Sequence, residues 1–192
     1  IAIPTTAGTG SEVTPIAILS DEEEQIKKGI VSAKIIPRYA VLDPCLTTGL
    51  PAHITAVTGM DALTHALEAY ISIKANDYTN MLALEAIEFI SRNIRKVYAD
   101  GNNIAARQNM LMGSLLAGIA FANAGVAAVH AFAYPLGGMF HIPHGLANSL
   151  MLSTIMEFNL AGNQEKARQI GKCFGIENPC ARSVLDEINR LC

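Results

Sequence analysis

Hydrophobic residues follow two different spacings along the chain, and the change falls near Pro51. Before it, short apolar runs ended by turn residues predict β-strands at residues 1–3, 17–19, 27–31 and 39–44. After it, apolar residues recur every three or four positions, which predicts helices over residues 53–73, 78–98, 103–124, 145–160 and 164–174. Breaks between these helices are expected at residues 101–103, 135–138 and 175–179.

A strand-rich segment followed by a helix-rich segment indicates an α/β part joined to an all-α part. We therefore expect two domains, residues 1–48 and residues 49–192. The first residues, Ile1 to Ile3, resemble a strand entered halfway, so the chain is expected to be a piece of a longer protein.

One long segment carries no formal charge. Between Gln108 and Met156 there is no Asp, Glu, Lys or Arg, yet three of the five histidines lie there: His130, His141 and His144. Within it, Met110–Val129 is long enough to span a bilayer. Its many glycines and alanines, and the lack of an aromatic belt or basic flank, argue against lipid contact. We expect a buried helix at the centre of a bundle, with a membrane span as the weaker alternative.

The amino-acid composition argues against a disordered chain and against a nucleic-acid-binding protein. The chain is 51% hydrophobic and 16% charged, against a typical charged share of about 25%, so it is too apolar for a disordered chain. A net charge of -3 provides no basic surface for nucleic acid. The four cysteines form no CxxC pair and no signal peptide begins the chain, which together favour free thiols in the cytoplasm.

The segment Pro4–Glu12 (PTTAGTGSE) follows the first predicted strand and is rich in glycine and hydroxyl side chains. Backbone N–H groups and threonine hydroxyls in such a loop can approach a phosphate or a ribose closely. The segment matches neither GxGxxG nor a P-loop, so taken alone an ordinary turn is the better interpretation.

Asp61 and His65 are four residues apart and so lie on one face of a predicted helix. An isolated pair of this kind is usually a hydrogen bond on a solvated face. Here apolar residues surround the pair, which favours burial: Ala62, Leu63, Ala66 and Leu67. A buried carboxylate needs a partner, and a cation is one way to provide it.

His130 and His144 lie in the uncharged segment, on either side of a predicted break at Pro135 and Gly137–Gly138. Pro143 is favoured at the start of a helix, which places His144 in an opening turn. One buried histidine is more often an ordinary core residue, but a cluster in a charge-free segment favours a site. Four residues could then converge from three helices as three nitrogen ligands and one oxygen ligand: Asp61, His65, His130 and His144. That set suits Fe²⁺ or Zn²⁺ better than Ca²⁺ or Mg²⁺.

Over essentially its whole length, the chain resembles the iron-containing (group III) alcohol dehydrogenases. The resemblance rests on Pro4–Glu12, on Gly59–Glu68 (GMDALTHALE), and on the spacing of His130 from the PHG segment at Pro143–Gly145. It implies a dehydroquinate-synthase-like architecture. Residues 1–48 would end a dinucleotide-binding α/β domain, and residues 49–192 would form a helical metal-binding domain, incomplete at its C-terminal end. The implied metal ligands are Asp61, His65, His130 and His144, holding Fe²⁺, with Zn²⁺ as the alternative.

The resemblance also implies a nicotinamide cofactor, NAD or NADP. The residues expected to contact it are Thr5, Thr6 and Thr9 of the loop, Lys27 on the following hairpin, and Ile18 lining the same cleft. The family's GGGS phosphate loop is not found in this sequence. Many members carry a histidine near the substrate four residues after the third ligand, where this chain has Tyr134. A tyrosine hydroxyl, with a reference pKa of about 10, is a weaker base, so the proton path is expected to differ.

The implied activity is hydride transfer between NAD(P) and a primary or secondary alcohol, or its aldehyde or ketone. The apolar composition suggests surface that is meant to be covered, so a homo-oligomer is expected. One alternative is a glycerol-dehydrogenase-like or dehydroquinate-synthase-like enzyme of the same fold, although those retain fewer histidines. The other alternative is a metal-binding fragment without catalysis.

Overall fold

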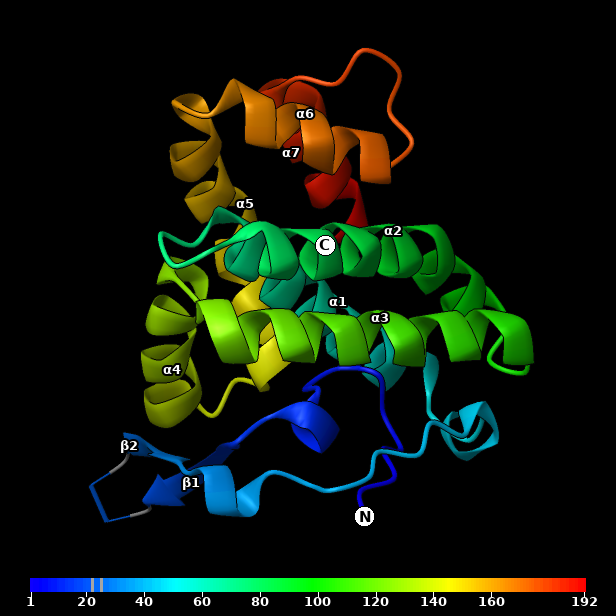
Figure 1. Ribbon diagram of the computed structural model, residues 1–192, viewed down its shortest axis with the longest axis vertical. Helices are drawn as coiled ribbons and strands as arrows, with labels where there is room; N and C mark the ends of the chain where they lie inside the picture. Colours follow the sequence, from blue (N-terminus) through cyan, green and yellow to red (C-terminus); the bar gives the residue numbers. More distant parts are fainter. Residues whose placement is uncertain (22, 25) are drawn as a thin grey trace.

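The computed structural model describes residues 1–21, 23–24 and 26–192, without the side chains of Ser20 and Lys27. Along the described residues, a two-stranded hairpin precedes seven α-helices (Figure 1). The helices are α1 (Ala52–Ile71), α2 (Asp77–Ala99), α3 (Ile104–Ala124), α4 (Ala128–Phe140), α5 (His144–Ala161), α6 (Gln164–Cys173) and α7 (Ala181–Leu191). The five predicted helices correspond to α1, α2, α3, α5 and α6, each within two residues at either end.

The hairpin consists of β1 (Ile16–Asp21) and β2 (Ile26–Val31), paired antiparallel with Ile16 opposite Val31. It confirms the predicted strands at residues 17–19 and 27–31. The predicted strands at residues 1–3 and 39–44 are wrong, because these segments form only one isolated parallel bridge, between Ala2 and Ala40. A strand needs a ladder of neighbours, and the described chain offers these two segments a single contact. Three 3₁₀ helices complete this part: Ser11–Val13, Ala33–Ile35 and Pro44–Thr47.

Helix α1 is the central element, and α2, α3 and α5 pack against it. Every residue from Gly59 to Tyr70 is buried, as expected of a helix that is apolar on all sides. In Figure 1, α2 and α3 lie across α1, the hairpin lies at one end of the molecule near α4, and α6 and α7 lie at the other. The polar side chains that α1 carries inward are therefore enclosed by the bundle.

The uncharged segment forms α3, α4 and α5 rather than one long helix. The buried helix expected in the Met110–Val129 stretch is α3, which ends at Ala124, and Gly125 follows with φ 76°. That left-handed conformation suits glycine and turns the chain. Among the described residues no single helix is long and apolar enough to cross a membrane. Only α3 and α4 taken together pass that test, and their axes meet at 103°.

The break predicted at residues 135–138 is also wrong, since α4 continues through Pro135 and ends at Phe140. A proline inside a helix removes one backbone hydrogen bond. Packing of α4 on α5, with Val129, His130 and Ala133 buried, offsets that loss. His141 ends the helix in a left-handed conformation with φ 55°. His130 and His144 therefore still lie on different helices, as expected.

Candidate metal centre

Helix α1 presents Asp61 and His65 inside the bundle, one turn apart. Asp61 is 4% exposed and His65 is 6% exposed. The fully buried neighbours Ala62 and Leu63 confirm the expected burial. The imidazole of His65 stacks on the ring of Phe121 from α3, with a centroid separation of 4.4 Å. The pair is thus held in fixed positions away from bulk water.

Helices α4 and α5 bring the other two histidines to the same place. His130, in the first turn of α4, is 1% exposed, and its ring lies 4.6 Å from that of His65. His144 is the first residue of α5, directly after Pro143. Its side chain is 30% exposed and its ring lies 5.2 Å from that of His130. His144 is therefore the one member of the group with a face toward solvent.

The structure brings all four sequence-predicted ligands together. Each of Asp61, His65, His130 and His144 offers one ligand atom, and these atoms all lie within 4.8 Å of one another. From Asp61 Oδ1, the Nε2 atom of His144 is 3.6 Å away and that of His130 is 4.0 Å away. Ligand atoms that converge in this way from three helices form a group that could hold a single metal ion.

Burial keeps the His65 imidazole neutral. The pKa of His65 is lowered from 6.5 to about 4, chiefly by desolvation, with the nearby rings of His130 and His144 acting in the same direction and Asp61 and the backbone of Gly8 in the opposite one. A neutral ring retains a lone pair that a metal can accept. At neutral pH His65 is therefore ready to act as a metal ligand.

Two polar residues that the sequence analysis did not single out complete the centre. Asn148 of α5 is fully buried, and its amide Nδ2 donates to Asp61 Oδ1 at 2.6 Å. Glu68 of α1 is fully buried and contacts His130 Nδ1 at 2.5 Å. Both residues could have been predicted from helical spacing, which puts them on the same helix face as a candidate ligand. Asn148 lies one turn after His144, and Glu68 lies two turns after Asp61.

The donor set fits a divalent cation. Asp61 is a buried carboxylate that accepts a hydrogen bond from the neutral amide of Asn148. Within the described chain, Asn148 Oδ1 is buried without a hydrogen-bond partner. A buried negative charge facing three imidazoles is compensated best by a cation, and three nitrogens with one oxygen suit iron or zinc.

Tyr134 lies beside this group, one turn after His130 on α4. Its ring stacks on that of His144, with centroids 5.7 Å apart and planes 10° from parallel. Burial, followed by the charges of Asp61 and Glu68, raises the pKa of the Tyr134 hydroxyl. The hydroxyl therefore stays protonated near neutral pH and can donate a hydrogen bond.

The loop Pro4–Glu12 packs its small residues inward and keeps hydroxyl groups outside. A Cβ added to Gly8 would lie 3.0 Å from Thr58 Cβ on α1. A Cβ added to Gly10, which has φ 59°, would lie 2.7 Å from Gly118 Cα on α3. Thr5 and Thr9 are exposed and Thr6 is partly buried. The loop is thus anchored on α1, which carries His65, and on α3, which packs beside it. Two of its three threonines are exposed to solvent.

The remaining predicted cofactor residues lie on the hairpin. Ile18 is exposed on β1 opposite Gly29 of β2, and β2 contacts α4. Lys27 pairs through its backbone with Ser20, and its side chain lies outside the described residues.

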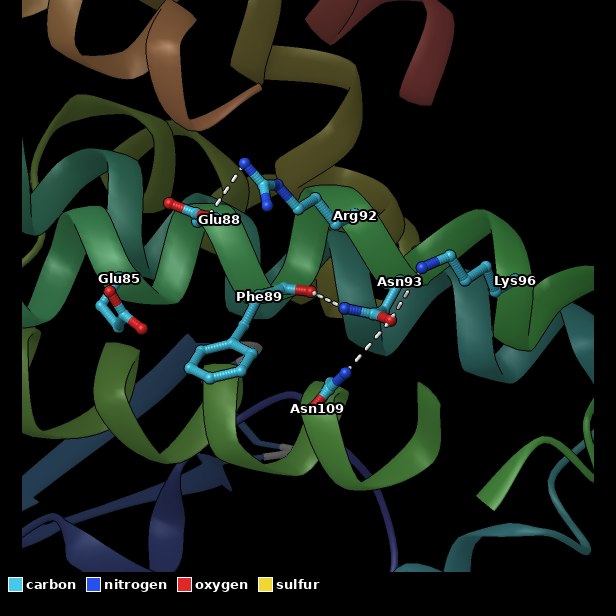
Figure 2. A pocket seen from close by; sticks show the side chains of 7 residues that line it. All are labelled: Glu85, Glu88, Phe89, Arg92, Asn93, Lys96 and Asn109. Carbon is cyan, nitrogen blue, oxygen red and sulfur yellow. Dashed lines mark hydrogen bonds and ion pairs between the residues drawn. The ribbon is translucent and has the colours of Figure 1, made fainter. Parts of the chain in front are cut away.

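Another hollow, of about 230 Å³, lies between α2 and α3 and contains none of the predicted site residues. Figure 2 shows that its walls are already paired: Glu88 with Arg92 at 2.9 Å, and Asn93 with Asn109 at 3.3 Å. Four of the side chains that line this hollow are therefore already engaged with one another.

Comparison with known proteins places the chain in a family. The family described as "Fe-containing alcohol dehydrogenase family, C-terminal" matches residues 55–192, and "Iron-containing alcohol dehydrogenase" matches residues 1–44. The 1,3-propanediol dehydrogenase of Klebsiella pneumoniae is 48% identical over 186 residues, covering 97% of this chain and 48% of that protein. The chain spans about half the length of the curated relatives it matches.

Solved structures of similar proteins support the same family assignment. The crystal structure of a 1,3-propanediol oxidoreductase superposes with a TM-score of 0.94 at 45% identity, over 99% of this chain and 51% of that chain. The sulfoacetaldehyde reductase of Bifidobacterium kashiwanohense, solved in complex with NAD⁺, superposes with a TM-score of 0.91 at 35% identity, over 99% of this chain and 50% of that chain. The chain therefore belongs to the iron-containing alcohol dehydrogenase family.

Proposed function

We propose that the protein is a metal-dependent alcohol dehydrogenase that transfers a hydride between NAD(P) and a primary or secondary alcohol, or its aldehyde or ketone. Four residues would hold one Fe²⁺: Asp61, His65, His130 and His144. The observation that carries this proposal is the convergence of their ligand atoms, all within 4.8 Å of one another, in a buried site of a family member.

The proposed chemistry divides between the cation and the chain. When bound, a divalent cation supplies a Lewis acid that stabilises negative charge on the substrate oxygen. The surrounding uncharged helices exclude water, which keeps electrostatic interactions at this point strong. The partly exposed side of His144 is where we expect the substrate to enter. Tyr134 would hydrogen-bond the substrate hydroxyl and carry its proton outward, a role supported by its stacking on His144.

The cofactor is proposed to bind beside this site. Thr5, Thr6 and Thr9, together with Ile18 and Lys27, would line its cleft. The anchoring of the loop on α1 and α3 supports this, because it holds the threonines next to the helices that carry His65 and Phe121. We propose a boundary between the dinucleotide-binding part, residues 1–48, and the metal-binding part, residues 49–192.

Several finer assignments belong to the same proposal. The family descriptions favour iron over zinc, and the NAD⁺ complex of the sulfoacetaldehyde reductase favours NAD over NADP. A homo-oligomer, a cytoplasmic location and a small alcohol as substrate, with no nucleic acid or membrane partner, remain predictions. Light scattering on the purified protein would test the oligomer, with a monomer as the contrary result.

Turnover with defined metal content tests the function. The purified protein would be stripped with a chelator, reloaded anaerobically with Fe²⁺ or Zn²⁺, and assayed for NAD(P)H formation with a panel of short alcohols. We expect activity only after metal is restored. Full metal occupancy without turnover on any alcohol would favour the non-catalytic alternative.

A further inference from the structure

Glu68 is the most deeply buried acid beside the candidate metal centre, and both of its carboxylate oxygens have partners. It is 0% exposed. Its Oε1 accepts the backbone N–H of Val129 at 2.6 Å, and its Oε2 lies 2.5 Å from His130 Nδ1. Glu68 therefore links α1 to two successive residues at the start of α4.

The neighbouring amide indicates where the proton on His130 lies. Asp61 can only accept, so the Asn148 group that lies 2.6 Å from its Oδ1 is the Nδ2 donor. The same Nδ2 is 3.3 Å from the Nε2 atoms of both His130 and His144. A donor beside Nε2 favours an unprotonated Nε2, and a carboxylate 2.5 Å from Nδ1 favours a proton there, so the ring proton is assigned to Nδ1 and is donated to Glu68.

The start of α4 also depends on this carboxylate. Ala127 precedes the helix and provides no side-chain cap. The first N–H groups of a helix need acceptors, and a negative charge near them is stabilising. Glu68 Oε1 accepts one of these N–H groups, that of Val129. The buried Glu68 side chain thus stabilises the first turn of α4 and also holds the orientation of the His130 ring.

We propose that Glu68 is a positioning residue that keeps His130 in the tautomer with the proton on Nδ1, so that Nε2 offers its lone pair to the metal. This rests on the proposed function, because it assumes that His130 is a ligand. Carboxylates that orient metal-bound histidines from outside typically change metal affinity about 10- to 100-fold when they are removed.

Glu68→Gln is the sharpest variant, since it keeps the size of the side chain. If the glutamine oxygen accepts the Val129 N–H, its amide NH₂ faces His130 Nδ1 and favours the tautomer protonated on Nε2. If the amide is turned over, two donors face each other at Val129. We expect the Fe²⁺ or Zn²⁺ affinity to fall about 10- to 100-fold, with the helical circular dichroism retained. Glu85→Gln, the same change on the exposed surface of α2, is the control and should leave the affinity unchanged.

Imidazole ¹⁵N chemical shifts of the metal-free protein provide a readout that needs neither metal nor activity. We expect the wild-type His130 to carry its proton on Nδ1 and the Glu68→Gln variant to shift toward Nε2. A wild-type ring protonated on Nε2, or unchanged metal affinity in a folded Glu68→Gln variant, would overturn the proposal. If the wild-type shifts agree but the protein binds no metal, the proposed function fails while the Glu68–His130 hydrogen bond stands.

Discussion

Gly145 packs directly on the backbone carbonyl of Val57, so that α5 approaches α1 closely at this point. A Cβ on Gly145 would overlap the Val57 carbonyl oxygen and lie 3.0 Å from its carbonyl carbon. Because Gly145 follows His144, this contact also determines how closely His144 approaches Asp61. The close approach of the two helices is therefore part of the metal centre.

Gly145→Ala is expected to move α5 away from α1. Backbone atoms cannot rotate aside as a flexible side chain can, so we expect a loss of about 1–3 kcal/mol in the free energy of unfolding and weaker metal binding. Denaturant unfolding and a metal titration measure the two effects. Gly162→Ala is the matched control, since nothing lies within 4 Å of the added Cβ. Equal stability of the two variants would argue against the close packing.

The stability of the metal-free protein should fall as the pH is lowered from about 6.5 to about 4. Burial lowers the pKa of folded His65 from 6.5 to about 4, so over this range the unfolded chain binds a proton that the folded chain does not. Above pH 6.5 the stabilisation that comes from the neutral His65 is fully present. Below pH 4 both the folded and the unfolded chain are protonated at this residue, so it causes no further loss of stability. The largest loss in the free energy of unfolding is about 3 kcal/mol, which follows from the size of the His65 pKa shift.

Chemical denaturation at a series of pH values checks this dependence. His65→Gln should flatten the slope, whereas His53→Gln, at an exposed position of the same helix, should preserve it. A slope that survives His65→Gln unchanged would assign the effect to another group.

The free cysteines should differ in reactivity. Burial raises the pKa of the Cys173 thiol to about 11, whereas hydrogen bonds from the backbone and side chain of Ser183 lower the pKa of the exposed Cys180 thiol. Since the thiolate is the reactive form, we expect iodoacetamide to label Cys180 early and Cys173 last in the native protein. Peptide mass spectrometry over time measures the order, and early labelling of Cys173 would contradict the packing of α6.

Removing the Tyr134 hydroxyl tests its proposed role near the substrate. Tyr134→Phe keeps the ring that stacks on His144, so metal affinity should not change. Loss of one hydrogen bond to the substrate should lower kcat/KM for the alcohol about tenfold. A variant with wild-type kcat/KM would exclude the hydroxyl from the proton path, and one that loses metal would indicate a structural role instead.

The candidate ligands could be predicted because their signals are local in sequence. Asp61 and His65 are one helical turn apart, and Pro143 marks the start of the helix that carries His144. The convergence of three helices follows from burial of those helices in one bundle. Spacing alone could not provide the distances between the ligand atoms.

Features that depend on distant contacts were missed or wrongly predicted. The sequence around Pro135 resembles a break, yet packing on α5 and the hydrogen bond from Val129 to Glu68, 61 positions away in the sequence, stabilise α4. Asn148 and Asp61 are 87 positions apart, so nothing local indicates their hydrogen bond. The predicted strands at residues 1–3 and 39–44 likewise required neighbours that the local pattern does not supply.

The central claim is that one divalent cation binds among Asp61, His65, His130 and His144. His144 is the best ligand to remove, because its side chain is partly exposed and its loss should leave the fold intact. The most direct measurement is anaerobic titration of the metal-free protein with Fe²⁺, with His144→Ala beside the wild type. We predict one ion per chain for the wild type and a loss of binding in the variant. Equal stoichiometry and affinity in the two proteins would contradict the assignment.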